Sequence, residues 1–213
     1  MFNVCYQCGQ YRADKEIDPH GPAAICPECG TRHAFRMLPL LVVGGASGSG
    51  KSSVLQVLAG RFTQAVLLEG DLLWRPEFNQ PETGYRDFFQ TWLRLAKNIH
   101  QSGRPVVIFN AGMGVPSNIE ECVERRYFSQ VHYLGLVCSD PALAARLKAR
   151  PAWRGSGADE WIRGQQDFNR WLREKGPAQG MDLLDTGGKD LEQTAAETAQ
   201  WIRRKIDAAR PNP

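Results

Sequence analysis

Short apolar runs alternate along the chain with longer stretches whose apolar residues recur at helical spacing. Residues 39–43, Pro-Leu-Leu-Val-Val, form one continuous apolar run, which is typical of a strand covered on both faces. Strands are predicted over residues 38–44, 65–68, 105–109, 131–137 and 182–184. Helices are predicted from about Lys51 and over residues 88–99, 117–127, 142–149, 161–172 and 191–206.

This alternation of strands and helices predicts the fold class. Strands separated by helical stretches form parallel sheets, because the crossover helices return each strand to the same direction. The pattern therefore predicts an α/β domain built on an open parallel five-stranded sheet with helices on both faces. About 36 residues precede the first strand of this series and show a different composition, rich in cysteine.

Residues 45–52, Gly-Ala-Ser-Gly-Ser-Gly-Lys-Ser, fit the phosphate-loop pattern G-x-x-x-x-G-K-[ST] between a strand and a helix. Glycines let the backbone curl around an anion, and the helix N-terminus points its N–H groups at the same phosphates. Lys51 is expected to reach the outer phosphates of ATP, and the Ser52 hydroxyl is expected to bind Mg²⁺. The expected nucleotide-binding residues are Gly45, Ser47, Gly48, Ser49, Gly50, Lys51, Ser52, Ser53, Arg146 and Thr186.

Composition and charge limit the partners. The chain has 213 residues, of which 42% are hydrophobic, so it can bury one core with room for a small appendage. Its formal charge of +3 does not by itself indicate nucleic-acid binding. No apolar stretch is long enough to cross a bilayer and the N-terminus lacks signal-peptide character. We therefore expect a cytoplasmic protein with no membrane partner.

Four of the six cysteines form two C-x-x-C pairs, Cys5 with Cys8 and Cys26 with Cys29, separated by seventeen residues. This spacing is close to that of a four-cysteine zinc site, in which four thiolates complete a closed tetrahedron. The segment resembles a zinc ribbon, and metal binding would supply most of its folding free energy. His20 and His33 are alternative ligands. Its scattered basic residues either serve nucleic-acid phosphates or form a solvated rim.

In a parallel sheet, ligands gather beyond the carboxyl ends of the strands. Asp71 follows the second strand and is a candidate base for an acceptor hydroxyl, or a Mg²⁺ ligand together with Ser52. Alternatively, Asp71 caps the next helix, and Glu69 is a second candidate for the same work. Arg75 could hold an anionic part of the acceptor. Asn110 stands where many nucleotide hydrolases carry a magnesium-organising aspartate, which disfavours a motor or switch ATPase.

Basic residues around 146–160, including Lys148, predict a lid. Mobile arginines that close over the phosphates stabilise the transferring group and exclude water, and Arg150 and Arg154 are the expected pair. Arg146 is placed against the nucleotide base, and the turn at Thr186 is expected to meet adenine. The alternatives are a solvent-facing basic helix and an ordinary loop.

This order of parts resembles the P-loop kinases of the nucleoside and nucleotide kinase group, which includes adenylate, shikimate, gluconate and chloramphenicol kinases. The resemblance covers residues 38–208 and rests on the phosphate loop, the strand end at 69–71, the arginine-bearing region and residues 184–186. It implies a sheet in the order 2-3-1-4-5, ATP with Mg²⁺ as donor, Asp71 as base, and Arg150 and Arg154 as lid residues. The chain also resembles AAA-family ATPase-like proteins with an N-terminal zinc ribbon.

We accordingly divide the chain into a zinc ribbon at residues 1–36, a P-loop kinase domain at 37–209 and a tail at 210–213 that is expected to fray. The favoured function is Mg²⁺-dependent transfer of the ATP γ-phosphoryl group to a hydroxyl or phosphate of a small polar metabolite. Trp74 and Tyr85 either stack on a ring of this acceptor or belong to the core. The alternatives are a polynucleotide 5′-hydroxyl kinase or nucleic-acid-stimulated ATPase, and a non-catalytic ATP-gated module that binds a partner.

Overall fold

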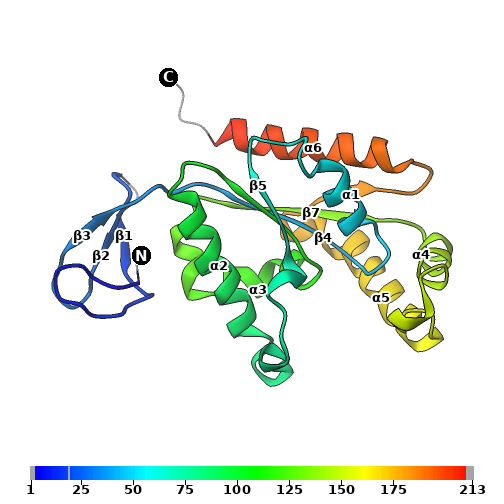
Figure 1. The fold of residues 1–213 in the computed structure, drawn as a ribbon, viewed down its shortest axis with the longest axis horizontal. Helices are drawn as coiled ribbons and strands as arrows, with labels where there is room; N and C mark the ends of the chain where they lie inside the picture. The colour runs from blue at the N-terminus through cyan, green and yellow to red at the C-terminus, as the bar shows by residue number, and fades with distance from the viewer. Residues whose placement is uncertain (1–2, 19, 210–213) are drawn as a thin grey trace.

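The computed structural model describes residues 3–18 and 20–209, and its main sheet has five parallel strands (Figure 1). They are β4 (Leu40–Gly45), β5 (Val66–Glu69), β6 (Val106–Phe109), β7 (Val131–Val137) and β8 (Asp182–Asp185). Their order is β5-β6-β4-β7-β8, and every neighbouring pair is parallel. Counted along the chain this order is 2-3-1-4-5, so the predicted sheet is confirmed.

The helices follow the predicted stretches with one exception. They are α1 (Lys51–Leu58), α2 (Arg86–His100), α3 (Pro116–Glu120), α4 (Asp140–Lys148), α5 (Asp159–Lys175) and α6 (Leu191–Ala208). The single helix predicted over 117–127 is wrong, because α3 ends at Glu120 and a 3₁₀ helix, Val123–Tyr127, follows it. The backbone N–H of Glu124 donates to Gln90 Oε1 of α2 at 3.2 Å, which takes it out of a helical ladder.

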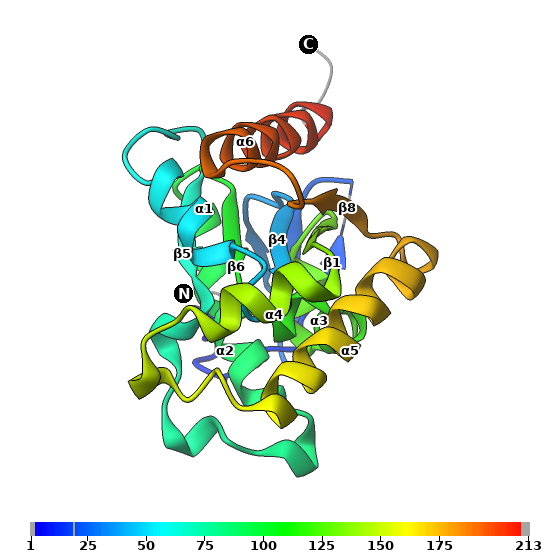
Figure 2. The same ribbon diagram turned by 90° about the vertical axis from the view of Figure 1, so that its right-hand side faces the viewer.

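Alternate residues of each strand face opposite layers of helices. Leu41 and Val43 of β4 pack with residues of α1 and α6, whereas Leu40 and Val42 pack with residues of α2, α3 and α5. Figures 1 and 2 show α1 and α6 together on one side of the sheet, α2, α3 and α5 on the opposite side, and α4 near the ends of the strands. Both layers are buried, which is why the strands read as continuous apolar runs.

Two glycines bring separate backbones together behind the phosphate loop. A Cβ on Gly44 of β4 would lie 2.7 Å from Cα of Gly114, and one on Gly114 would lie 2.6 Å from Cα of Gly44. No larger residue fits at either position without moving a backbone. Gly114, in the segment after β6, therefore serves close packing against β4.

The N-terminal segment forms a separate antiparallel sheet of β1 (Glu16–Asp18), β2 (Ala23–Ile25) and β3 (Arg32–Ala34). This ribbon packs on the segment after α3, where the ring of Tyr127 meets that of Phe35 edge-on at 5.8 Å between centroids. The Tyr127 hydroxyl donates to Ala13 O at 2.8 Å. The division at residue 36 stays a prediction, and the predicted frayed tail at 210–213 lies outside the described residues. No helix in the described ranges is long and apolar enough to span a membrane.

Buried charges sit where the ribbon meets α2. Glu124 is fully buried, and its carboxylate contacts the ammonium of Lys97, which is also buried, and Arg94 Nε at 3.0 Å. Asn3 of the ribbon donates to Glu124 Oε1 at 3.2 Å and accepts from Lys97. Lys15 of the ribbon, which is fully buried as well, donates to Asn3 O at 3.1 Å. These polar contacts hold the ribbon to α2 in one arrangement.

We predict that Glu124→Ala lowers the free energy of unfolding by about 3 to 5 kcal/mol, because it leaves the Lys97 ammonium buried without its carboxylate. The control is Glu192→Ala. The Arg61–Glu192 pair has side chains that are 66% and 67% exposed, and its loss should cost less than about 1 kcal/mol. Urea unfolding monitored by circular dichroism measures both. Equal losses in the two variants would contradict the structure.

His100 makes stability depend on pH. It lies at the end of α2, it is fully buried, and its Nε2 accepts a hydrogen bond from Val106 N at 3.1 Å. Burial lowers the pKa of His100 to about 4 from 6.5. The unfolded chain thus takes up a proton on this side chain at a higher pH than the folded chain does. We predict that this residue removes about 3 kcal/mol of stability as the pH falls from 6.5 to 4.

His100→Gln has no titrating group at this position, so its stability should fall less steeply over the same pH window. Exposed His20 supplies the control, because His20→Gln should retain the slope of the unmodified protein. Urea midpoints measured at several pH values provide the comparison. Identical slopes for all three proteins would show that His100 does not carry the effect.

Candidate active site

The phosphate loop leaves β4 and turns directly into α1. Gly48 and Gly50 adopt positive φ angles of 88° and 106°, a region that residues with a Cβ rarely occupy. At Gly45, where φ is 143°, a Cβ would lie 2.4 Å from the hydroxyl oxygen of Ser49. The glycines therefore permit the curled backbone, and the first N–H groups of α1 remain available to an anion.

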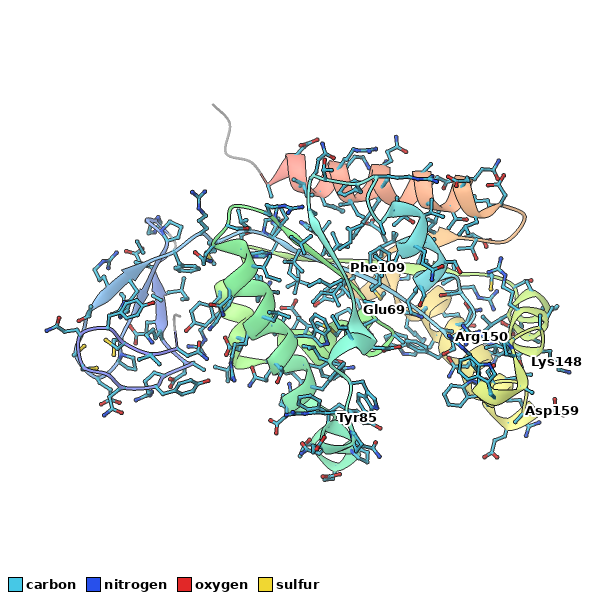
Figure 3. All side chains as sticks on the ribbon, in the orientation of Figure 1. Glu69, Tyr85, Phe109, Lys148, Arg150 and Asp159 are labelled. Atoms are coloured by element: carbon cyan, nitrogen blue, oxygen red, sulfur yellow. The ribbon has the colours of Figure 1, made fainter. Side chains whose placement is uncertain are left out.

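Lys51 folds back over this loop. Its Nζ donates to Gly45 O at 2.8 Å and to Ala46 O at 3.1 Å. Burial lowers the pKa of Lys51 to about 8, with the nearby Asp71 carboxylate acting in the opposite direction and Arg150 in the same one. Figure 3 labels Glu69, the last residue of β5, and Arg150, which follows α4. The charges of Asp71, Glu69 and Arg150 all act on the Lys51 ammonium.

The carboxylates after β5 form hydrogen bonds that differ from the predicted pairing. Ser52 Oγ donates to Glu69 Oε1 at 2.7 Å, whereas Asp71 Oδ1 accepts from Asn110 Nδ2 at 3.1 Å. Asp71 lies inside a 3₁₀ helix, Gly70–Leu73, whose N-cap is Glu69. The alternative that Asp71 caps a helix is therefore wrong, and Glu69 joins Ser52 in a position to bind a cation.

Asn110 holds Asp71 in place. Only 7% of Asn110 is exposed, and its Oδ1 accepts from the backbone N–H of Met113 at 3.0 Å. That bond fixes which way the amide points, so Nδ2 faces the Asp71 carboxylate. A Cβ at Gly70 would lie 2.3 Å from the Asn110 Cβ, so only glycine at position 70 admits this side chain.

A pocket of about 320 Å³ lies on one side of the phosphate loop. Arg146 of α4 closes it by donating to Thr186 Oγ1 at 2.9 Å and to Thr186 O at 3.0 Å. Thr186 follows β8, and α6 starts just beyond it with a reciprocal cap in which Asp190 and Gln193 bond each other's backbone N–H groups. Six of the ten predicted nucleotide-binding residues line this pocket: Gly48, Ser49, Gly50, Ser53, Arg146 and Thr186. The other four, Gly45, Ser47, Lys51 and Ser52, belong to the loop and the start of α1 but are not part of its lining.

The basic residues of the predicted lid lie in three different surroundings. Arg150 lines the same pocket and lies close enough to Lys51 to affect its pKa. The guanidinium of Arg154 lies 5.1 Å from the centre of the neighbouring Trp153 ring, in an exposed stretch. Lys148 pairs with Asp159 at 3.8 Å, and Figure 3 shows both at the outer edge of the molecule. The structure thus brings Arg150, but not Lys148, to the phosphate loop.

A second hollow, of about 610 Å³, lies on the other side and contains Asp71, Trp74 and Tyr85 among its lining residues. Arg75 was predicted to join them but points elsewhere. Its Nε lies 3.8 Å from Glu77 Oε2, and its guanidinium lies 4.8 Å from the centre of the Phe78 ring. The structure therefore gathers three of the four predicted acceptor residues.

Sequence reasoning missed two side chains of α5. Gln165 Oε1 accepts from the backbone N–H of Ser47 at 2.7 Å, which ties α5 to the phosphate loop. Trp161 lines the second hollow. Neither position carries a motif, because both contacts depend on how α5 packs against the sheet. The exposed tryptophan on an amphipathic helix was the available signal.

The ribbon brings the four predicted zinc ligands together. The sulfur atoms of Cys5, Cys8, Cys26 and Cys29 lie within 4.8 Å of one another, which suits a tetrahedral thiolate site. A backbone hydrogen bond from Cys8 is the main cause that lowers the pKa of the Cys5 thiol to about 5. His33 Nε2 lies 3.3 Å from Cys5 Sγ, beside the cluster, and His20 is exposed.

Two of the basic residues of the ribbon, Arg12 and Arg32, bind acids of the same module. Arg12 pairs with Asp14 at 2.7 Å and also with Glu28. Arg32 pairs with Asp18 at 2.5 Å. These pairs neutralise charge that a nucleic-acid surface would use for phosphates.

No family model and no curated protein sequence matches this chain. Among solved structures, the gluconokinase from Sinorhizobium meliloti 1021 is 22% identical with a TM-score of 0.54, covering 81% of this chain and 96% of that one. The tunicamycin resistance protein of Deinococcus radiodurans is 18% identical with a TM-score of 0.55, covering 78% and 96%. The thymidylate kinase of Candida albicans is 12% identical with a TM-score of 0.52, covering 85% and 97%. These likenesses confirm the predicted P-loop kinase fold.

We predict that Gly48→Ala weakens the binding of magnesium ATP by about tenfold or more, since the new Cβ distorts the loop. At this position a Cβ would lie 3.2 Å from side-chain atoms of Leu143 and Leu147 in addition to the strain of positive φ. Gly60→Ala is a matched control, because Gly60 also has positive φ, of 75°, but lies beyond the far end of α1 in open space.

Both glycine variants should lose about 1 to 2 kcal/mol of stability from backbone strain. Only Gly48→Ala should lose nucleotide affinity. Titration with a fluorescent ATP analogue, together with thermal unfolding, separates the two effects. Unchanged affinity in Gly48→Ala would mean that this loop does not hold the triphosphate.

Proposed function

We propose that this protein is a P-loop phosphotransferase. It transfers the γ-phosphoryl group of ATP, with Mg²⁺, to a hydroxyl or phosphate group of a small polar metabolite. The observation that carries the proposal is the place of Lys51. This side chain lies in electrostatic contact with Arg150, which lines the first pocket, and with Asp71, which lines the second hollow.

The residues on the first side fit a nucleoside triphosphate. The curled backbone at Gly48 and Gly50 and the N-terminus of α1 offer N–H groups to the phosphates, and Lys51 is free to exchange its bonds to loop carbonyls for phosphate oxygens. The hydroxyl of Ser49 is buried with no hydrogen-bond partner among the described residues, so a phosphate oxygen would satisfy it. Arg146 and Thr186 would border the base.

The oxygen donors near the loop fit Mg²⁺. Ser52 and Glu69 are already hydrogen-bonded, and Asp71 is close enough to Lys51 for its charge to favour the ammonium. A hydroxyl and carboxylates are the hard ligands that this ion prefers. When bound, Mg²⁺ supplies neutralisation of the charge on the phosphates.

Side chains of the protein would accept the proton and stabilise the transferring group. Asp71 would accept the proton of the acceptor hydroxyl, with its carboxylate aimed by Asn110. Lys51 and Arg150 would stabilise the negative charge that spreads over the transferring group. We assign a structural role to Zn²⁺ in the ribbon, because four thiolates leave no open position for a reactant.

Nothing in the described residues favours a polynucleotide acceptor or a non-catalytic module. Two ribbon arginines, Arg12 and Arg32, are paired with acids, and the second hollow has the size of a small-molecule site. A small metabolite therefore remains the proposed acceptor.

We predict that Asp71→Asn lowers the rate of phosphoryl transfer by about 10² to 10⁴-fold while ATP affinity changes little, because the amide cannot take up the hydroxyl proton. Asp87→Asn is the control. It changes an exposed acid in the first turn of α2 and should leave transfer unchanged. A screen of acceptors with labelled ATP, read by mass, identifies the product to follow. Full activity of Asp71→Asn would remove the proposed base.

A further inference from the structure

The hollow beside Asp71 has a wall of aromatic side chains from three parts of the chain. Trp74 follows the 3₁₀ helix after β5, Tyr85 and Phe88 lie at the start of α2, and Trp161 lies in the first turn of α5. The rings of Trp74 and Phe88 meet edge-on with centroids 5.3 Å apart. Trp74 and Trp161 are still 46% and 48% exposed, so both indoles offer flat apolar surface to a ligand.

The backbone at Tyr85 is strained in a way that shapes this wall. Tyr85 has φ of 58° and is the one residue other than glycine with positive φ among those the structure describes. Such a conformation costs about 1 to 3 kcal/mol and persists only where the surroundings enforce it. Here it turns the chain into α2 with the Tyr85 ring 6.1 Å from that of Trp74. The cost at a lining residue indicates a built ligand site rather than a gap in packing.

The only charged side chain among the described residues that line the hollow is acidic, Asp71. No lysine, arginine or histidine within the described ranges lines it, and its polar side chains are Asp71, Asn79 and Asn110. The nearest basic residues in sequence are engaged elsewhere. Arg75 lies over Phe78 and beside Glu77, and Arg86 donates to Glu121 Oε2 at 2.6 Å.

This charge pattern discriminates between kinds of acceptor. An acceptor with a carboxylate or phosphate would lose hydration on entering the hollow and would find no cation there in exchange. A protonated amine would gain contact with the aromatic rings, but the charge of Asp71 is already balanced in part by Lys51. An uncharged molecule pays neither cost. Its apolar ring would lie between the exposed indoles, and its hydroxyl would reach Asp71.

We propose that the acceptor is an uncharged, ring-bearing alcohol, held between Trp74 and Trp161 with its hydroxyl toward Asp71. This assignment rests on the proposed function and narrows it, because it excludes acceptors whose own charge is bound at this site. It also makes Trp161 a specificity-determining residue, contributed by α5 to the same hollow that Trp74 lines.

Three matched probes test the assignment: 4-(hydroxymethyl)benzamide, 4-(hydroxymethyl)benzoate and 4-(aminomethyl)benzyl alcohol. They share a ring and a hydroxyl group and differ in charge. Binding to the full chain, loaded with Mg²⁺ and a non-hydrolysable ATP analogue, is measured by ligand-observed NMR. We expect the amide to bind about tenfold more tightly than the benzoate or the amine.

Variants locate the binding. Trp74→Ala and Trp161→Ala should each weaken binding of the amide by about fivefold or more, since each removes a stacking surface. Trp153→Ala is the control, because Trp153 is 79% exposed and does not line the hollow. Asn79→Arg adds a cation to the lining and should shift the preference toward the benzoate. Thermal unfolding checks that each variant is folded.

The inference is overturned if the benzoate or the amine binds at least as tightly as the amide, if none of the three binds, or if Trp161→Ala binds like Trp153→Ala. Phosphorylation of an anionic acceptor that depends on Asp71 would overturn it while leaving the proposed function intact. Failure of the chain to bind magnesium ATP would instead contradict the proposed function. In that case the relative affinities of the three probes would still be measured by NMR, without nucleotide.

Discussion

The partly buried positive charge of Lys51 is the constraint around which the site is arranged. The loop that carries it follows a fully buried strand, so its ammonium is held by two loop carbonyls and by the fields of nearby side chains. Acids after β5 favour the charge, while desolvation and Arg150 oppose it. None of these interactions is a close ion pair. The Lys51 ammonium can therefore exchange its two carbonyl contacts for a phosphate oxygen, which carries more negative charge.

The strand order turns this charge into a two-sided site. With β4 in the middle of the sheet, the ends of β5 and β6 carry Asp71 and Asn110 to one side of the phosphate loop, and the end of β8 carries Thr186 to the other. Helix α5 is tied to the loop through Gln165 and reaches the acceptor side through Trp161. Position along the sheet therefore separates the two hollows, which the proposed function assigns to donor and acceptor, as expected for ligands at the carboxyl ends of parallel strands.

The sheet could be predicted because its strands are buried on both faces and their apolar runs are continuous, and the phosphate loop because its spacing is specific. The helix at 117–127 could not, because the backbone becomes extended at Cys122, with ψ of 139°, and the Glu124 N–H then bonds to Gln90 of α2, a contact between elements that the local sequence pattern does not show. The sequence also could not predict which side chains of the site form hydrogen bonds with one another. Glu69 and Asp71 are two positions apart, and only the 3₁₀ turn between them decides that Ser52 meets the first and Asn110 the second. The catalytic roles of these residues stay predictions.

The contact between ribbon and helix has a consequence for metal supply. Asn3 and Lys15 reach the Glu124 cluster only while the four cysteines hold their segment folded, and Lys97 stands on the same helix as Phe88 of the aromatic wall. Chelation would hydrate this junction and expose like charges along α2. If Zn²⁺ fills the four-cysteine cluster, its removal would therefore be expected to destabilise the contact between the ribbon and α2 as well as the ribbon itself.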